Sequence, residues 1–597
     1  IFISNHNQQE FAEKIMKAIN KIFASKYWWL LLLVFLVLVN YAASVIHTRF
    51  DLTKEKRYTL SKTTKHLISS LGDKVQIDVF LKGDFPSGFK KLAGTTKEFL
   101  NLLKDRNSSK INFRFIAPTD VMNDGRTLYG DSLVNLGAVP INLTVQKKEG
   151  QSSNIIFPVA LLQYKGKQEL VNLYPGASSK ISQEEINNAE ALLEYQFAKA
   201  LDKMNSDHKP AVAYAIGNGE PVDGRTYQMA TAVRSAYQFG LLNLHSLPKI
   251  PDEVNVLMIV KPAQQFSEEE KLKIDQFVMR GGKLLCFIDN LIAEQDSLSI
   301  KPETIAYDRN LNLTDLFFRY GLRINTDLVM DLQCDVIPFV VGGTAQNPQM
   351  EFLPWNYYPL LNAKNSKVTK GLGYVSGRFV NSIDTIAVKD VSKEPLLVTS
   401  PNSRIISTPA LISLNENKTT PQDAQFRKNA IPVAMLLEGK FTSLYRNRLT
   451  TVQQDSLKAA GEVFKSSSPD NKIIVVADGD ILFNEFIPPA TADAQPEPLP
   501  MGWNKYTYSE YLKNSEQGKL FVPVANKDFL LSCLEYLTSN SAISNLKNKE
   551  IVLRLLDSKK VRENRSTWQL INIVLPILLV ILAGWIYQEI RKRKYAA

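Results

Sequence analysis

The stretch Trp568–Tyr587 reads WQLINIVLPILLVILAGWIY and carries no charged residue. A helix rises about 1.5 Å per residue, so this stretch would be about 30 Å long, which is the thickness of a bilayer core. A second uncharged run, Trp28–Ile46 (WWLLLLVFLVLVNYAASVI), lies near the other end of the chain. The two runs predict transmembrane helices over residues 27–47 and 567–588, with everything between them forming one large loop outside the bilayer.

Basic residues flank both predicted spans. Lys14, Lys17, Lys21 and Lys26 precede the first span, and the sequence RKRK, residues 591–594, follows the second. Lysines and arginines are equally frequent on the domain side, so a simple count gives a tie. Long loops cross membranes largely regardless of charge, and the compact basic tail therefore favours cytoplasmic termini, residues 1–26 and 589–597. The large loop would then lie on the other side of the membrane, outside the cytoplasm.

The composition is that of a globular protein with several domains. The chain has 597 residues, of which 45% are hydrophobic and 22% charged, and its net charge is +11. Part of the basic excess lies beside the spans, where it can meet anionic lipid headgroups, and no nucleic-acid-reading motif accompanies it. The three cysteines and five histidines show no spacing typical of a metal site or a redox pair. The sequence therefore predicts membrane lipid as a partner, and no nucleic acid, metal or cofactor.

A first α/β domain is predicted over residues 48–181. Strands with alternating or continuous apolar residues are expected at 75–81, 111–116, 141–147, 157–164 and 168–173, and a helix at 89–106. The order strand, helix, strand, short helix, strand, strand is that of a thioredoxin-like layer. No cysteine precedes Cys286, so a redox role is excluded. A capping box at Ser182 then opens a connector helix, residues 182–206.

A second, larger α/β domain is predicted over residues 207–545. Continuous apolar strands at 211–216, 256–260, 284–288 and 473–477 alternate with helices, including one at 229–239. This pattern is typical of a doubly wound, parallel sheet that is covered on both faces. Residues 310–465 interrupt it as a long insertion with strands of its own. Residues 546–566 form a juxtamembrane return to the second span.

Polar residues follow the predicted parallel strands, at the edge where open α/β sheets bind ligands. Such an edge could hold a cation, a sugar or a peptide amine, although Asp and Asn also end strands and cap helices for purely structural reasons. The candidate ligand-binding residues are Asn218, Glu220, Asp289, Asn290, Asp478 and Asp480.

Templates for an enzyme fit poorly. Asp478-Gly-Asp480 after an apolar strand resembles the opening motif of haloacid-dehalogenase-type phosphohydrolases, whose chemistry needs a lysine and further acidic residues that hold Mg²⁺. Little parallel-sheet pattern remains after residue 487 to supply them. The chain has no phosphate-binding loop of the G-x-x-x-x-G-K-[ST] type, so it does not itself hydrolyse ATP. No catalytic residue is predicted, and a membrane-anchored phosphohydrolase is kept as an alternative.

Three residues within the predicted spans are unfavourable in the hydrocarbon core of a bilayer, namely Asn40, Asn572 and Pro576. Such residues either bond locally and lie near the headgroups or face the helices of a partner, where polar groups find hydrogen bonds. They are candidates for contact with a permease.

Several segments, in order, resemble the GldG family, the auxiliary, substrate-binding-type components of the gliding-motility ABC transporter of Bacteroidota. The segments are RFDLTKEKRYTLSKTTKHLI (49–68), GNGEP (217–221), GGKLLCFIDN (281–290), LTDLFFRYGLRINTDLVMDLQC (313–334), NSIDTI (381–386) and VVADGDILFNE (475–485). The resemblance implies a GIFT-like α/β domain. It also implies an inner-membrane protein that binds an ABC permease of the GldF type and an ATPase of the GldA type.

The resemblance further implies a non-enzymatic role in gliding motility, together with the linked type IX secretion machinery and its envelope proteins. An alternative is a periplasmic ligand-binding subunit that uses the acidic strand edge.

Overall fold

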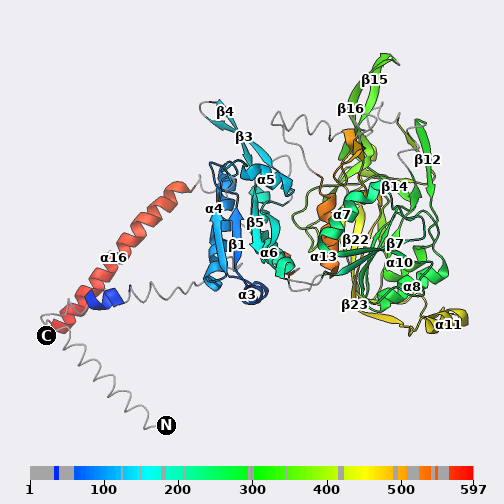
Figure 1. The fold of residues 1–597 in the computed structure, drawn as a ribbon. Helices are drawn as coiled ribbons and strands as arrows, with labels where there is room; N and C mark the ends of the chain where they lie inside the picture. Colours follow the sequence, from blue (N-terminus) through cyan, green and yellow to red (C-terminus); the bar gives the residue numbers. More distant parts are fainter. Residues whose placement is uncertain are drawn as a thin grey trace, which may run out of the picture. The chain divides into compact units, whose positions relative to one another are not determined.

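The structure is a computed structural model in which the helices and strands of most of the chain are placed (Figure 1). It describes residues 33–38, 40, 59–122, 125–138, 140–147, 150–175, 183–205, 209–293, 298, 301–344, 346–414, 423–487, 495–506, 508, 524–538, 543, 545–548 and 564–595. The chain divides into two units, Ile1–Thr59 and Leu60–Ala597. In the first unit, residues 33–38 and 40 are helical, and the rest of the predicted span at 27–47 lies outside the described residues.

A four-stranded sheet begins the second unit, with the strand order β2-β1-β5-β6. Its strands are β1 (Val75–Val79), β2 (Ile111–Phe115), β5 (Val159–Tyr164) and β6 (Lys167–Asn172). β1 is parallel to β2 and antiparallel to β5. β5 and β6, which match the strands expected at 157–164 and 168–173, form a hairpin with Lys165 and Gly166 at φ 49° and 73° in its turn. The mixed α/β character that the sequence predicts for this region is therefore present.

Helices α3 (Lys62–Ser69), α4 (Ser87–Arg106), α5 (Tyr129–Asn135) and α6 (Gln183–Asn205) accompany this sheet. Apolar residues at helical spacing on α6, from Ile186 to Met204, are buried in a core that also contains Phe89 and Leu162. A further hairpin, β3 (Ile141–Lys147) and β4 (Gly150–Ile156), was only half predicted. The polar sequence of β4, GQSSNII, gives no alternating signal.

The second sheet has ten strands, and its parallel part confirms the prediction of a doubly wound layer. The parallel strands lie in the order β23 (Ser467–Val476), β10 (Lys283–Phe287), β9 (Val254–Val260), β7 (Ala211–Ile216) and β8 (Gln238–Asn243). Alternate residues of one strand enter different cores: Val256 and Met258 pack with α7 (Tyr227–Ala236) and α13 (Asn526–Thr538), whereas Leu257 and Ile259 pack with α8 (Glu268–Met279). Helices thus cover both faces (Figure 1).

One predicted helix is shorter than expected. The sequence predicts a helix over 229–239, but α7 ends at Ala236 and the chain enters β8 at Gln238. Pairing of Gln238, Phe239 and Gly240 with Ala211, Val212 and Ala213 of β7 supplies the hydrogen bonds that a longer helix would have made. Tertiary pairing here overrides local helix propensity.

The predicted insertion, residues 310–465, does not stand apart from the sheet. It contributes strands β15 (Cys334–Thr344), β16 (Asn347–Ala363), β19 (Val391–Val398) and β22 (Pro432–Thr442), which extend the same sheet on the far side of β23. β22 runs antiparallel to β23, and β19 and β16 continue the antiparallel arrangement. The sheet is therefore mixed. The predicted parallel strands form one half of it, and strands from the insertion form the antiparallel half.

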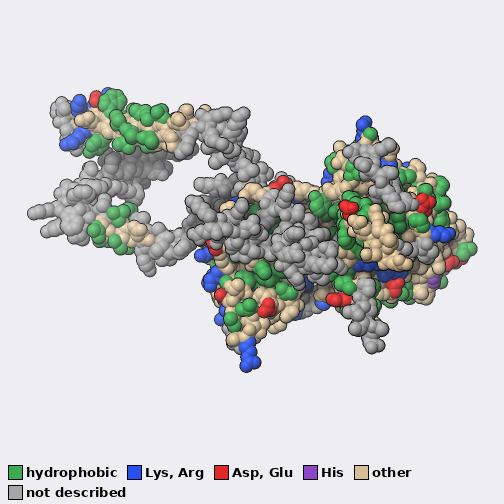
Figure 2. All heavy atoms as spheres, turned by 90° about the horizontal axis from the view of Figure 1, so that it is seen from above, with side chains coloured by type: hydrophobic (Ala, Val, Ile, Leu, Met, Phe, Trp, Pro, Cys, Tyr) green, Lys and Arg blue, Asp and Glu red, His purple; other side chains and the backbone are tan. Residues whose placement is uncertain are grey.

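The last helix, α16 (Arg565–Tyr595), contains the one candidate membrane span found among the described residues, Ser566–Arg593. None of its most apolar window is buried within the protein, and Pro576 lies inside the helix. Figure 2 shows its hydrophobic side chains at the surface, at the upper left. The span predicted at 567–588 is therefore present as a continuous helix with uncovered apolar side chains.

We expect the substitution Gly439→Ala to destabilise the ten-stranded sheet. Gly439 lies in β22 at φ 140°, and an added Cβ would stand 2.0 Å from the carbonyl oxygen of Asp390. The backbone conformation alone would cost about 1–3 kcal/mol, and the clash adds to it. Chemical denaturation should show the loss. The control is Gly240→Ala in β8, where no atom lies within 4 Å of the added Cβ, and an equal loss in both variants would contradict the prediction.

Candidate functional site

The carboxyl ends of the parallel strands form one edge of the ten-stranded sheet. Gly217–Glu220 follows β7, Lys261 follows β9, Ile288–Asn290 follows β10 and Ala477–Asp480 follows β23. Because β9, β10 and β23 are neighbours, the residues that follow them meet. β7 lies beyond β9, so its loop falls at one side of this meeting point.

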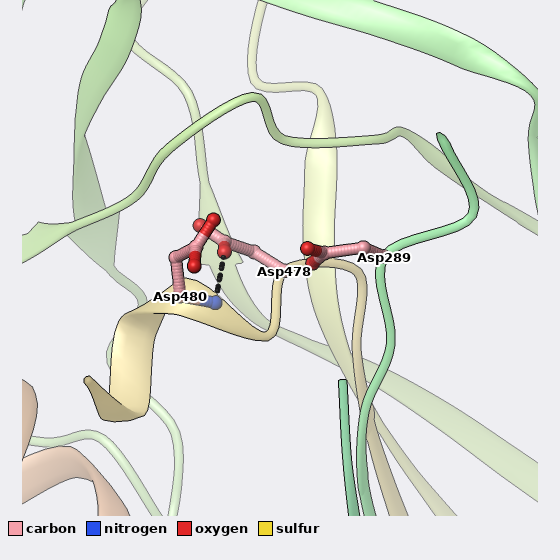
Figure 3. A group of neighbouring side chains, drawn as sticks. All are labelled: Asp289, Asp478 and Asp480. Atoms are coloured by element: carbon pink, nitrogen blue, oxygen red, sulfur yellow. Dashed lines mark hydrogen bonds between the residues drawn. The ribbon is translucent and has the colours of Figure 1, made fainter. Parts of the chain in front are cut away.

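Three of the predicted residues lie together there, with Asp289, Asp478 and Asp480 each offering a carboxylate oxygen within 4.8 Å of the others (Figure 3). Lys261 lies among them. Its Nζ is 2.6 Å from Asp480 Oδ1 and 3.0 Å from Asp289 Oδ2. The lysine backbone has φ 44°, a left-handed conformation that is uncommon outside glycine.

The carboxylates also accept backbone hydrogen bonds. Asp478 accepts from the N–H of Asp480 at 2.8 Å and from the N–H of Arg378 at 2.7 Å, and Asp289 accepts from the N–H of Gly479 at 2.5 Å. Asp478 is completely buried. A carboxylate whose two oxygens are both bound and that has no access to solvent is poorly placed to attack a phosphate, which disfavours the phosphohydrolase alternative.

Burial sets the electrostatics of this cluster. It raises the pKa of Asp478 well above its usual value, with the nearby charges of Asp289 and Asp480 adding to the effect. Burial also raises the pKa of Asp289, and the ammonium of Lys261 works against that rise. A divalent cation has the right oxygen ligands here, but it would have to displace the ammonium of Lys261. The arrangement is therefore that of an internal ion cluster.

Asn218 and Glu220 form a second cluster with Glu270 and His245. Asn218 donates its Nδ2 to Glu270 Oε2 at 3.1 Å, and Glu220 Oε2 accepts the N–H of Asn218 at 2.8 Å. His245 places Nδ1 3.0 Å from Glu270 Oε1 and Nε2 2.7 Å from the carbonyl oxygen of Gly217. Burial raises the pKa of Glu220, and the neighbouring charge of Glu270 raises it further.

Asn290 belongs to neither cluster. Its backbone N–H donates to Asn381 Oδ1 at 2.8 Å, its Nδ2 donates to the carbonyl of Ile324 at 3.2 Å, and it lines a separate cavity. The six residues predicted for one edge thus fall into three places, and their role as a ligand site stays a prediction. Sequence reasoning missed Lys261, Glu270 and His245. The capping box at Ser267 pointed to Glu270, and Lys261 is the charged residue that directly ends an apolar strand.

The permease-facing candidates have different surroundings. Asn40 donates its Nδ2 to the carbonyl oxygen of Leu36 at 3.1 Å, which is the local bond expected of a polar residue in an apolar helix. Asn572 and Pro576 lie within α16, both exposed. Their contact with a partner stays a prediction.

Replacing Lys261 with methionine should destabilise the protein. The change leaves the buried Asp289 and the partly buried Asp480 without their counter-ion, at a cost of about 3–5 kcal/mol at pH 7. Loss of Lys261 raises the already raised pKa of Asp289 and Asp478 further. The penalty should therefore be complete above these folded-state pKa values and should shrink as the pH falls towards about 3.9, where the unfolded carboxylates also take up protons.

Thermal and denaturant unfolding at pH 5 and pH 7 measure this effect. The matched control is Lys458→Met on α11 (Thr451–Ala459), where a side chain with 75% exposure pairs with an exposed Asp455. The control should unfold like the parent protein at both pH values. A Lys261→Met variant as stable as the control, or one whose loss does not shrink at pH 5, would refute the counter-ion role.

Comparison with known proteins gives matches over much of the chain. Residues 209–532 match the model of a family of transporter auxiliary components, which is described as "ABC-type uncharacterized transport system". Residues 54–163 match a domain of unknown function. An uncharacterized protein of Borreliella burgdorferi is 23% identical over 459 residues, which cover 74% of this chain and 83% of that protein.

Among solved structures, the N-terminal domain of mmIFT52 aligns with 55% of this chain and 98% of its own at 12% identity, with a TM-score of 0.28. The exo-beta-1,4-mannosidase Op5Man5 from Opitutaceae bacterium strain TAV5 aligns with 81% of this chain and 55% of its own at 9% identity, with a TM-score of 0.19. Scores this low carry no argument about fold. The family model, by contrast, covers more than half of the 597 residues, and the chain therefore belongs to the family of auxiliary components of ABC-type transport systems.

Proposed function

We propose that this protein is a GldG-type subunit, a non-enzymatic component of the ABC transporter that serves gliding motility and the linked type IX secretion machinery. Family membership implies a permease and an ATPase as partners in general. The resemblance of six ordered segments to the GldG family supports the narrower assignment, with GldF-like and GldA-like partners. The observation that carries the proposal is α16, a helix long enough to cross a bilayer, none of whose most apolar window is buried by the part of the chain that the structure describes.

The proposed topology is a two-pass inner-membrane protein with cytoplasmic termini and a large periplasmic region. The uncharged run at 28–46 and the helix α16 support two anchors, and the basic tail at 591–594 supports the orientation. A freely diffusing receptor gains little from a second anchor. A subunit that stays docked on a permease or transmits force to it gains much from being held at both ends.

The alternative of a ligand-binding subunit that uses the acidic strand edge has less support. The carboxylates of Asp289 and Asp480 pair with Lys261, and those of Asp478 and Glu220 accept backbone N–H groups. A ligand at this edge would have to break these bonds before making its own. The exchange would recover little free energy.

The proposal is tested by purifying the tagged full-length chain from its native membrane in mild detergent and identifying its partners by mass spectrometry. An ABC permease and an ABC ATPase should be recovered in a fixed ratio to the chain. A chain that emerges alone or only with itself would overturn the docked-subunit proposal. A partner set without an ATPase would likewise contradict it.

A variant then locates the contact. Asn572→Leu should lower the recovery of permease several-fold, because a polar group in a helix interface contributes about 0.6–2 kcal/mol. The matched control is Val580→Leu on the same helix, where the side chain is 72% exposed, and its recovery should match that of the parent chain. Equal recovery with Asn572→Leu and with the control would exclude Asn572 from the permease contact.

A further inference from the structure

A cavity of about 680 Å³ lies beside Asn290, outside both polar clusters described above. It is bounded by the segment that follows β12 (Glu303–Asp308), by α10 (Thr314–Tyr320) and by the segment that follows β22. A volume of this size is typical of sites for small molecules. Most residues that line the cavity belong to the predicted insertion, residues 310–465. The proposed role in a transporter does not assign a function to this insertion.

One wall of the cavity is a face of α10. Asp315, Phe318 and Arg319 are spaced at i, i+3 and i+4, which places them side by side on a helix. The neighbouring Leu316, Phe317 and Tyr320 are buried, so the helix has its own core contacts. Phe318 nevertheless leaves 51% of its side chain exposed at the cavity. An exposed aromatic ring on a helix that is otherwise well packed offers an apolar contact to a ligand.

A buried lysine holds this wall in place. Lys271 of α8 is completely buried, and its Nζ lies 2.6 Å from Glu268 Oε1, 3.1 Å from Asp315 Oδ2 and 3.3 Å from Asn312 Oδ1. Asn312 in turn donates its Nδ2 to the carbonyl of Phe266 at 2.9 Å. The position of Asp315 and the loop before α10 are therefore fixed before any ligand arrives, which lowers the cost of binding.

Another part of the lining is a bent loop that carries a carboxylate. Asn310 and Asn312 have φ values of 52° and 60°, in the left-handed region that non-glycine residues seldom occupy. Asp308 accepts the N–H of Asn310 at 2.8 Å, which fixes the turn. Asp308 is exposed and lines the cavity. Asparagine adopts this conformation more readily than most residues that carry a Cβ, so Asn310 and Asn312 suit this turn.

The cations of the cavity come from two segments. Arg319 lines the cavity and donates its Nε to the carbonyl of Ser443 at 3.2 Å, which anchors the guanidinium. Arg448 is exposed at the cavity, and its guanidinium makes no hydrogen bond or ion pair with any residue that the structure describes. A guanidinium is well suited to bind a carboxylate through paired hydrogen bonds.

We propose that this cavity binds a short peptide with free ends, the carboxylate on Arg448 and Arg319, the ammonium on Asp308, and an apolar side chain against Phe318. The lining offers a positive charge, a negative charge and an apolar surface within one cavity. A zwitterionic ligand with an apolar side chain could contact all three at once. The site belongs to the chain alone. Binding to it is independent of any permease, so it is tested separately from the docked-subunit proposal.

The test is isothermal titration calorimetry of the purified full-length chain in detergent with the tripeptide Ala-Leu-Ala. The tripeptide should bind, and both N-acetylation and C-amidation should weaken binding about tenfold, because each removes one charged hydrogen-bonding group. The substitution Arg448→Gln should weaken binding of the free tripeptide to the same extent but leave binding of the C-amidated form almost unchanged.

The matched control is Arg446→Gln, an exposed arginine two residues away that does not line the cavity. It should bind the tripeptide like the parent chain. Phe318→Ala should weaken binding of Ala-Leu-Ala more than binding of tri-alanine. Thermal unfolding of each variant verifies the fold, and both arginines are exposed, so neither substitution should lower the midpoint. Absence of tripeptide binding, or binding that neither end-blocking nor Arg448→Gln alters, would overturn the proposal.

Discussion

The carboxyl edge of the ten-stranded sheet depends on one ammonium group. Lys261 reaches from the end of β9 to carboxylates at the ends of β10 and β23, so a single cation ties three strands together. Three acidic side chains brought this close would repel one another in a medium of low dielectric constant. A buried ion pair adds little net stability compared with apolar packing, but it specifies an arrangement, because any other pairing leaves a charge uncompensated. We therefore regard Lys261 as the residue that fixes how these loops meet.

This dependence explains which parts of the edge the sequence could predict. Asp289, Asp478 and Asp480 meet because their strands are neighbours, and the continuous apolar strands that precede them are easily recognised. Asn218 and Glu220 follow β7, a strand of the same type, but β9 lies between β7 and β10. These two residues therefore lie apart from the three aspartates, and the periodicity of the sequence does not reveal this strand order. Lys261 was missed because nothing in a sequence shows that a lysine will adopt a left-handed backbone and turn its ammonium back over the sheet.

The antiparallel half of the sheet sets a further limit on prediction from sequence. β22, β19 and β16 belong to the segment that was expected to be an insertion with strands of its own, and these strands continue the parallel half beyond β23. Strands that are edges or half exposed carry weak apolar patterns, as in β15 with its exposed Val340 and Val341. Their partners lie far away in the sequence, so only the folded chain shows the pairing. The cavity beside Asn290 has the same origin, since its walls come from segments that are distant in sequence.

The distribution of charge and apolar surface bears on how such a subunit could work. An auxiliary subunit influences a transporter only through differences in contact free energy between the transporter's states. The buried charges at the sheet edge are bound within the chain, so they contribute little to such differences. The uncovered apolar side chains of α16 have no such internal partners among the described residues, and neither does the guanidinium of Arg448 at the cavity. Contacts made at α16 would hold the subunit on the membrane complex, whereas occupancy of the cavity would change the free energy of the domain outside the bilayer. Within the sheet, the Lys261 cluster resists rotation of β23 against β9, because such a rotation would separate an ammonium from its carboxylates.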